Sequence, residues 1–260
     1  MSMKNLTFII TLAMLFVVGT ASAQQIIAHR GHHSVKGAEE NSLAALRAAE
    51  KDGLYAVELD VNMTSDGELV VVHGPWLGEK SDPDRLNVQR SDLATLCSKR
   101  LKNGEAVPTL EEYLSEAADM PSLRLIVEVK EHATPQRETE VVRKVIALVK
   151  QYKLQDRVEY ISFRQHICNE FVRLAPSNTP VLYLGSNLTP EYVKGLGYTG
   201  ISYSVDALKR VTRWIDEAHR LGLKVNIWTV NSAEDATWAV KQGVDYITTD
   251  NPAMVQKYTK

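Results

Sequence analysis

Short apolar runs alternate with longer amphipathic segments along residues 24–260. The runs are rich in Val and Ile, which is typical of strands covered on both faces. Eight of them are predicted as strands, at residues 25–28, 56–61, 124–129, 158–162, 180–183, 200–202, 224–228 and 246–249. Between the strands, apolar residues recur at helical spacing. Helices are therefore predicted at residues 42–52, 110–118, 139–152, 167–174, 190–195, 209–221 and 233–242.

Several glycines support these boundaries. Gly53, Gly222 and Gly243 each stand between a predicted helix and the next strand, where a left-handed C-cap is expected. Eight strands with intervening helices indicate a parallel sheet covered on both faces, and their number matches the (β/α)₈ TIM-type barrel. An open doubly wound sheet remains the alternative, because the number of strands does not prove that the sheet closes.

One region interrupts the alternation. Residues 69–72 are predicted to form a hairpin partner for the second strand, through the turn sequence Ser65-Asp66-Gly67. Residues 74–108 then show no sustained periodicity, apart from a short helix expected near residues 91–96. Loops of this length are usually functional or disordered. We interpret the segment as a small insertion after the second strand, either a lid over the site or a surface excursion without a role in binding.

The amino-terminal residues have the pattern of a signal peptide. Lys4 precedes an apolar core at residues 6–19, and Ala21-Ser22-Ala23 matches the small-x-small cleavage pattern. A membrane anchor is less well supported, since the core is shorter than the ~20 residues that span a bilayer. We therefore predict a signal peptide at residues 1–23, a barrel domain at residues 24–260, and a periplasmic or secreted location without stable membrane insertion after cleavage.

Composition excludes some classes of partner and leaves the cysteines open. The chain has a net charge of −2, and residues 1–23 contribute only Lys4, so the predicted mature chain carries −3. Such a balance lacks the basic footprint of a nucleic-acid-binding protein. Cys97 and Cys168 are too few for a disulfide framework, and their spacing does not decide whether they pair.

Paired acids in the second predicted strand give the first indication of chemistry. Glu58 and Asp60 are two residues apart, so their side chains should lie on one face of the strand. Adjacent carboxylates repel unless a cation lies between them. Carboxylate oxygens are hard ligands that suit Ca²⁺ or Mg²⁺. The spacing therefore predicts one bound divalent cation.

Other charged residues stand where strands are predicted to end. His29 and Arg30 follow the first strand, His73 follows the run at residues 69–72, and Glu128 and Lys130 end the third strand. In a βα barrel the carboxyl ends of the strands meet at one rim, where active sites are found. Histidines, an arginine and a cation gathered there are what cleavage of a phosphodiester requires.

The same residues belong to a set of motifs that runs through the chain: His29-Arg30, Glu40-Asn41, Glu58-x-Asp60, Thr64-x-Asp66-Gly67, His73, Glu128-x-Lys130, Trp228-Thr229-Val230-Asn231 and Thr248-x-Asp250-Asn251-Pro252. In these motifs and their order the chain resembles the glycerophosphodiester phosphodiesterase family. The resemblance implies a (β/α)₈ barrel, a metal held by Glu58, Asp60 and Glu128, and acid–base roles for His29 and His73.

The sequence departs from the family pattern in two places. The second histidine is commonly followed by Asp, whereas here it forms His73-Gly74. The usual Pro-Glu-Asn is Glu39-Glu40-Asn41 in this chain. Glycine at position 74 removes a carboxylate that would orient His73 or a nearby loop, and so bears on the efficiency of proton transfer.

Together with these residues, the resemblance implies metal-dependent hydrolysis of a glycerophosphodiester to glycerol 3-phosphate and an alcohol. Arg30 and Lys130 would bind the phosphate. His29 would act as base and His73 as acid, although the sequence does not fix that order. The nucleophile would be water or a neighbouring substrate hydroxyl, and the substrate a small, water-soluble diester.

Three alternatives remain at this point: a lysophospholipase D acting on lipid diesters, a barrel glycosidase with paired carboxylates, and a binding protein without catalysis. Trp228 and Glu40 are further candidates for substrate contact. The remaining histidines near the motifs are expected to face solvent rather than take part in catalysis, namely His32, His33, His132 and His166.

Overall fold

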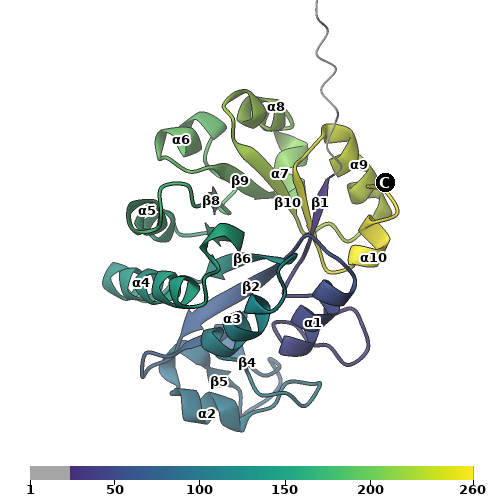
Figure 1. The fold of residues 1–260 in the computed structure, drawn as a ribbon. Helices are drawn as coiled ribbons and strands as arrows, with labels where there is room; N and C mark the ends of the chain where they lie inside the picture. Colours follow the sequence, from purple (N-terminus) through teal and green to yellow (C-terminus); the bar gives the residue numbers. More distant parts are fainter. Residues whose placement is uncertain (1–23, 260) are drawn as a thin grey trace, which may run out of the picture.

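The computed structural model describes residues 24–259, and eight of their strands form a closed parallel barrel (Figure 1). The barrel closes because the first strand pairs in parallel with both the second and the last. In chain order the strands are β1 Gln25–Ala28, β2 Ala56–Met63, β6 Arg124–Val129, β7 Val158–Ser162, β8 Val181–Tyr183, β9 Gly200–Ser204, β10 Lys224–Trp228 and β11 Tyr246–Thr249. The predicted barrel is confirmed, and the open sheet is excluded.

Helices surround the barrel (Figure 1). They are α1 Leu43–Lys51, α3 Leu110–Ala118, α4 Pro135–Gln151, α5 Gln165–Leu174, α6 Pro190–Gly195, α7 Val205–Arg210, α8 Arg213–Arg220, α9 Ala233–Gln242 and α10 Pro252–Val255, with a short 3₁₀ turn η2 at Gln155–Arg157. Polar side chains cap most of their amino ends; in α3, Thr109 and Glu112 form a reciprocal capping box. Gly53, Gly222 and Gly243 have φ of +62°, +71° and +69°, which confirms their predicted left-handed conformation.

Two predicted helix boundaries were wrong. The helix predicted at residues 209–221 is two helices, because α7 begins at the cap Ser204 and the chain leaves helical geometry at Val211. Val211 and Thr212 are both β-branched, which weakens helix formation at this point. The helix predicted at residues 139–152 starts four residues earlier, at Pro135, because Thr134 caps it and proline favours the first helical turn.

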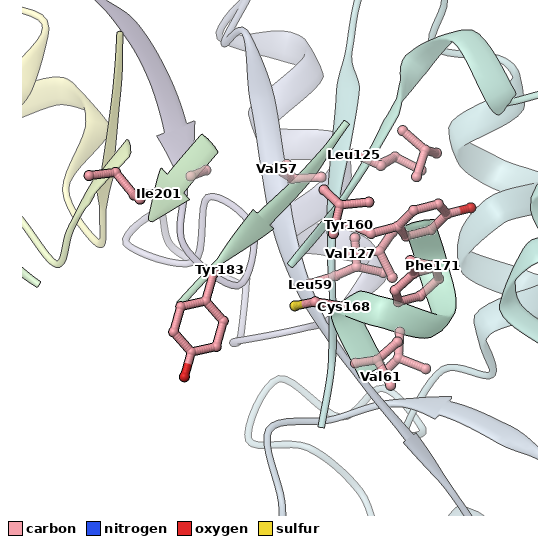
Figure 2. Close-up of a cluster of buried hydrophobic side chains, with 14 of the residues drawn as sticks. Val57, Leu59, Val61, Leu125, Val127, Tyr160, Cys168, Phe171, Tyr183 and Ile201 are labelled. Carbon is pink, nitrogen blue, oxygen red and sulfur yellow. The ribbon is translucent and has the colours of Figure 1, made fainter. Parts of the chain in front are cut away.

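Side chains along β2 alternate between the two sides of the barrel wall. Val57, Leu59 and Val61 pack outward in the layer between strands and helices, as Figure 2 shows. Tyr160 and Phe171 belong to the same layer, with their rings stacked 3.9 Å apart between centroids. The intervening residues of β2 therefore point into the barrel, and they include Glu58 and Asp60.

The insertion at residues 74–108 has a small core of its own beside the barrel. Strand β3, Leu69–Val71, pairs antiparallel with β2, as the hairpin prediction required. A two-stranded ribbon of β4 Trp76–Leu77 and β5 Leu86–Asn87 follows, then the 3₁₀ helix η1 Val88–Arg90 and helix α2 Leu93–Ser98. Its buried side chains join those of β3 and the residues after it: Val70, Val72, Val88, Leu96 and Val107.

The structure also bears on the cysteines and on membrane insertion. Cys97 and Cys168 are both free. Within residues 24–259, no helix combines the length and apolar character needed to cross a bilayer. The predicted signal peptide at residues 1–23 lies outside the described residues, so it stays a prediction.

Candidate active site

Three buried carboxylates converge at the carboxyl-terminal end of the barrel. Glu58 and Asp60 project from β2, and Glu128 projects from β6, which pairs with β2 so that Asp60 stands opposite Glu128. All three side chains are buried, and one oxygen from each lies within 4.8 Å of the others. The spacing seen in the sequence thus brings the predicted metal ligands together.

Two cations lie against these acids. The Lys130 ammonium is 2.6 Å from Asp60 Oδ1 and 2.5 Å from Glu128 Oε1. Arg30 Nε is 3.4 Å from Asp60 Oδ2, and the Arg30 backbone N–H donates to Glu58 Oε2 at 2.9 Å. Both predicted phosphate-binding residues therefore lie at the carboxylate cluster.

Burial and neighbouring charges raise the pKa of two of the three carboxyl groups and lower the pKa of the third. Burial raises the pKa of Glu58, and the negative charge of Asp60 raises it further. Burial likewise raises the pKa of Glu128, although Lys130 opposes the shift. For Asp60, burial also acts to raise the pKa, but the Lys130 ammonium and neighbouring donors outweigh it and lower the pKa. Without further positive charge, the three acids cannot all stay ionised easily.

The cluster fits a divalent cation. Glu58 Oε1 is buried and has no hydrogen-bond partner among residues 24–259, a costly arrangement for a carboxylate oxygen. The three side chains offer hard oxygen ligands of the kind that Ca²⁺ and Mg²⁺ prefer. A cation coordinated by Glu58 Oε1 would give that oxygen a partner and would offset the repulsion between the three acids.

Asn41 holds Asp60 in place, a role that the sequence analysis did not assign. Its amide Nδ2 donates to Asp60 Oδ2 at 2.8 Å, and its Oδ1 accepts from the Asp60 backbone N–H at 3.1 Å. Asn41 adopts φ of +61°, a left-handed conformation that asparagine tolerates better than most residues. Its position in the Glu40-Asn41 motif was the available signal.

Asp250 holds His29 and was also missed. Because β1 pairs with β11, His29 and Asp250 follow neighbouring strand ends. His29 Nδ1 lies 2.7 Å from Asp250 Oδ1, while His29 Nε2 lies 3.9 Å from Glu58 Oε2. Asn231 fixes Asp250 in turn, donating to Oδ2 at 2.5 Å and accepting from its backbone N–H at 3.0 Å. The ring is therefore held on its Nδ1 side, with Nε2 directed toward the carboxylates.

His73 lacks such a partner. Within the described part of the chain we find no hydrogen bond to its ring, and burial lowers its pKa. Gly74 has φ of +63°, and a Cβ there would come within 3.0 Å of the Asn62 amide nitrogen. Asn62 is itself held, since it donates to the Val72 carbonyl at 2.8 Å. The backbone after His73 is thus built for glycine, which accounts for the departure from the family pattern.

One cavity joins both histidines to the cluster. With a volume of about 150 Å³, it is lined by His29, His73, Arg30, Glu58, Glu128 and Lys130 on one side. The opposite wall is neutral and includes Phe163, Leu184, Asn226 and Trp228. The Trp228 indole donates to the Ser202 carbonyl at 2.8 Å, and its ring meets Phe163 edge-on. Asn226 and Trp228 are two residues apart on β10, and both side chains line this cavity.

Comparison with known proteins agrees with this geometry. Residues 29–254 match the model of the glycerophosphoryl diester phosphodiesterase family. A glycerophosphodiester phosphodiesterase from Parabacteroides distasonis has a crystal structure that superposes with a TM-score of 0.86 at 37% identity, over 90% of this chain and 96% of that one. The chain belongs to this family.

Two further relatives extend the comparison. A glycerophosphodiester phosphodiesterase from Caldanaerobacter subterraneus is 27% identical over 87% of this chain and 94% of its own length. A phosphodiesterase from Oleispira antarctica, solved with the product sn-glycerol-3-phosphate, has the same fold, with a TM-score of 0.75 at 23% identity over 91% of this chain and 96% of that one. Membership of this enzyme family supports the phosphodiesterase prediction over the glycosidase and binding-protein alternatives.

The remaining candidates of the sequence analysis fall into two groups. Glu40 accepts from Arg30 Nη1 at 2.7 Å, so it orients a residue of the cluster.

Among the other histidines, the expectation of solvent exposure was wrong for His32 and His132, which are buried. His132 Nε2 accepts from the Met63 backbone N–H at 3.1 Å and its Nδ1 lies 2.8 Å from the Lys130 carbonyl, so it fastens β2 to the segment after β6.

The other two histidines are partly buried. His33 Nε2 lies 3.4 Å from Asp250 Oδ1, so His33 shares the carboxylate that holds His29. His166 contacts Thr139 and the Pro135 carbonyl, each at 3.1 Å, and joins α5 to α4. Neither lines the cavity that holds the cluster.

Proposed function

We propose that this chain hydrolyses glycerophosphodiesters to glycerol 3-phosphate and an alcohol, with a divalent metal ion and histidine acid–base catalysis. The observation that carries the proposal is the cavity that brings His29 and His73 to the same carboxylates and cations. Each of these groups has a use in cleaving a phosphodiester, and together they account for the charged residues of the rim.

Charge stabilisation comes from three sources in this proposal. Glu58, Asp60 and Glu128 would hold the metal ion, Ca²⁺ or Mg²⁺, which supplies Lewis-acid stabilisation of the phosphate oxygens. Arg30 and Lys130 lie at the same cluster and neutralise charge that builds up on the non-bridging oxygens in the transition state. Placing these charges in advance lowers the barrier, because the protein need not reorganise during the reaction.

Proton transfer is divided between the histidines. Contact of His29 Nδ1 with the Asp250 carboxylate favours the tautomer in which Nδ1 donates and Nε2 has a free lone pair. His29 would therefore accept the proton of the nucleophile, which is water or the neighbouring hydroxyl of the substrate. His73 would protonate the departing alkoxide, and its lowered pKa makes its protonated form a stronger acid.

The substrate we propose is a small, deacylated diester rather than a bilayer lipid. The cavity has charged groups where the phosphate of the substrate would bind. The neutral wall opposite them is short, which leaves little apolar surface for an acyl chain. Sn-glycerol-3-phosphate, the product bound in the Oleispira relative, is the product proposed for this chain. We also propose export to the periplasm or medium, on the pattern of residues 1–23.

The test is metal-dependent release of glycerol 3-phosphate from glycerophosphocholine, followed with glycerol-3-phosphate dehydrogenase. Activity should disappear in excess chelator and return with Mg²⁺ or Ca²⁺. Lysophosphatidylcholine serves as the competing substrate. Faster turnover of the lysolipid would replace this proposal with the lysophospholipase D alternative, and turnover that persists in chelator would remove the metal from it.

A further inference from the structure

A second, larger cavity opens beside the first. It has a volume of about 590 Å³ and lies between residues 39–41 and the insertion. His73 borders both cavities, whereas His29 borders only the inner one. The two cavities therefore share as a lining residue the histidine to which we assign protonation of the leaving alcohol.

The inner cavity cannot hold a whole diester. Its volume of about 150 Å³ is below the ~300–1,000 Å³ that is typical of small-molecule sites, whereas the outer cavity lies within that range. If the phosphate lies at Arg30 and Lys130 inside, one of its two alcohol groups must extend outward. Because His73 lines both cavities, a group that extends past His73 would enter the outer cavity.

Charge around the outer cavity is mixed and largely paired. Lys102 Nζ lies 3.1 Å from Glu79 Oε1, and Lys99 Nζ lies 3.6 Å from Asp82 Oδ2. Arg100 and Glu39 also line it. Glu40, which pairs with Arg30, lines it too, so the wall presents both hydrogen-bond donors and acceptors, and its four acids and three bases give a formal net charge of −1.

The aromatic residue of this cavity is already engaged by a cation. The Arg85 guanidinium lies over the Trp76 ring, 4.3 Å from its centroid. Because Arg85 covers one face of the ring, its positive charge opposes the binding of a quaternary ammonium at the same ring. A choline group would therefore gain little here.

We propose that the outer cavity is the subsite for the leaving alcohol and that it selects neutral, polyhydroxylated alcohols over cationic ones. Hydroxyl groups can both donate and accept, so a polyol matches a wall of paired ammonium and carboxylate groups. The part of the Trp76 ring that Arg85 leaves exposed supplies an apolar surface for its carbon skeleton. This inference rests on the proposed function, since it takes His73 as the acid.

The experiment compares kcat/KM for glycerophosphoinositol and glycerophosphocholine. The parent enzyme should prefer the inositol diester by about tenfold, which corresponds to about 1.4 kcal/mol. Trp76→Ala, at a side chain that is 44% exposed, should reduce that ratio to near one. Ser81→Trp, which fills the cavity from an exposed position on its wall, should reduce it as well.

Matched controls separate the cavity from general effects. Tyr192→Ala removes an exposed aromatic from α6, and Ser177→Trp adds one to an exposed loop before β8, so both should keep the parent's ratio. Thermal unfolding of each variant verifies folding. A parent that prefers glycerophosphocholine, or a preference for inositol that survives both cavity variants, overturns the inference. Failure to hydrolyse either diester would instead overturn the proposed function.

Discussion

The two halves of the barrel rim differ in charge. The ends of β1, β2 and β6 carry His29, Arg30, the three carboxylates and Lys130, whereas the ends of β7 to β10 supply neutral groups such as Phe163, Ser202 and Trp228. The charged strands pair directly with one another, β1 with β2 and β2 with β6. Their charges therefore converge on one side of the cavity, where the proposed substrate would place its phosphate, and the neutral half would contact the rest of that substrate.

The neutral half is ordered by hydrogen bonds rather than by ion pairs. Asn226 donates to Ser202 Oγ at 2.8 Å and accepts from Thr248 Oγ1 at 3.0 Å, all three being buried. Such a network is satisfied without any ligand. Changes in the charged half should therefore act on the chemical step, and changes in the neutral half mainly on binding.

The largest effect is expected from Asp60→Asn. This change keeps the size of the side chain but removes one charge from the ligand cluster and from the Lys130 pair. Loss of metal binding should lower kcat/KM by roughly 10⁴, since a metal ion contributes several kcal/mol to charge stabilisation. Calorimetric titration with Mg²⁺ or Ca²⁺ should show greatly weakened binding. Asp216→Asn, on the exposed face of α8, is the control, and equal metal affinity in both variants would contradict the assigned ligands.

The next largest effects concern the histidines. His29→Ala and His73→Ala should each lower kcat by roughly 10²–10⁴, the usual contribution of general acid–base catalysis. Metal affinity should change little, because neither ring belongs to the carboxylate cluster. His166→Ala serves as the control, since its ring joins α4 to α5 away from the cavity. A His73→Ala variant as active as the parent would mean that only one histidine is used.

A smaller effect is expected from Asp250, which contacts His29 and lies outside the carboxylate cluster. Asp250→Asn should lower kcat by about 10–100-fold, as for other groups that orient a functional histidine. His29 would stay in place but lose the anion that favours its tautomer. Asp245→Asn is a matched control, because Asp245 contacts His219 at 3.0 Å at the opposite end of β11. Equal kcat in the two variants would show that Asp250 does not act through His29.

Asp250 should also affect stability in acid. Burial acts to raise its pKa, but hydrogen bonds with His29, His33 and Asn231 outweigh this and bring the pKa below the ordinary value. A carboxylate with a lowered folded-state pKa stabilises the fold above its unfolded pKa of about 4, and this contribution is lost as the pH falls toward the folded-state value. Urea unfolding of parent and Asp250→Asn should therefore give free energies that converge below about pH 4. A constant difference from pH 7 to pH 3 would contradict this.

The sequence predicted the charged half well because its signal is local. Glu58 and Asp60 alternate with Val57, Leu59 and Val61, so one short run shows both the strand and the face that carries the acids. Strand ends follow from the same runs, and the carboxyl ends of a barrel's strands meet at one rim. Residue spacing and strand order were therefore sufficient to predict that the three carboxylates lie together.

The groups that hold these side chains could not be predicted in the same way. Asp250 reaches His29 across 221 positions of sequence, and only closure of the barrel between β1 and β11 brings them together. Asn41 acts through a left-handed backbone conformation that no periodicity reveals. Burial of His132 depends on where the segment after β6 folds back on β2. Motif membership marked the first two as notable but did not give their contacts.

The smallest effect is expected in the neutral half, from Phe163→Ala. The Phe163 ring is 46% exposed at the cavity mouth and meets Trp228 edge-on, with centroids 5.6 Å apart. Removing the ring takes away an aromatic contact for the substrate, and contacts of this kind contribute about 0.5–1.5 kcal/mol beyond their buried area, equivalent to roughly 2–10-fold in binding. We therefore expect KM to rise by that factor while kcat stays within about twofold, because no charge in the cluster moves.

Steady-state kinetics with saturating metal measure both constants for Phe163→Ala, and Tyr192→Ala, an exposed aromatic on α6, is the control. A rise in KM confined to Phe163→Ala would assign the neutral half to binding. A fall in kcat as large as that of the histidine variants would show instead that Phe163 positions the reacting groups. In that case the two halves of the rim would act together in the chemical step, because removing an uncharged ring could slow proton transfer only by displacing the substrate relative to His29 or His73.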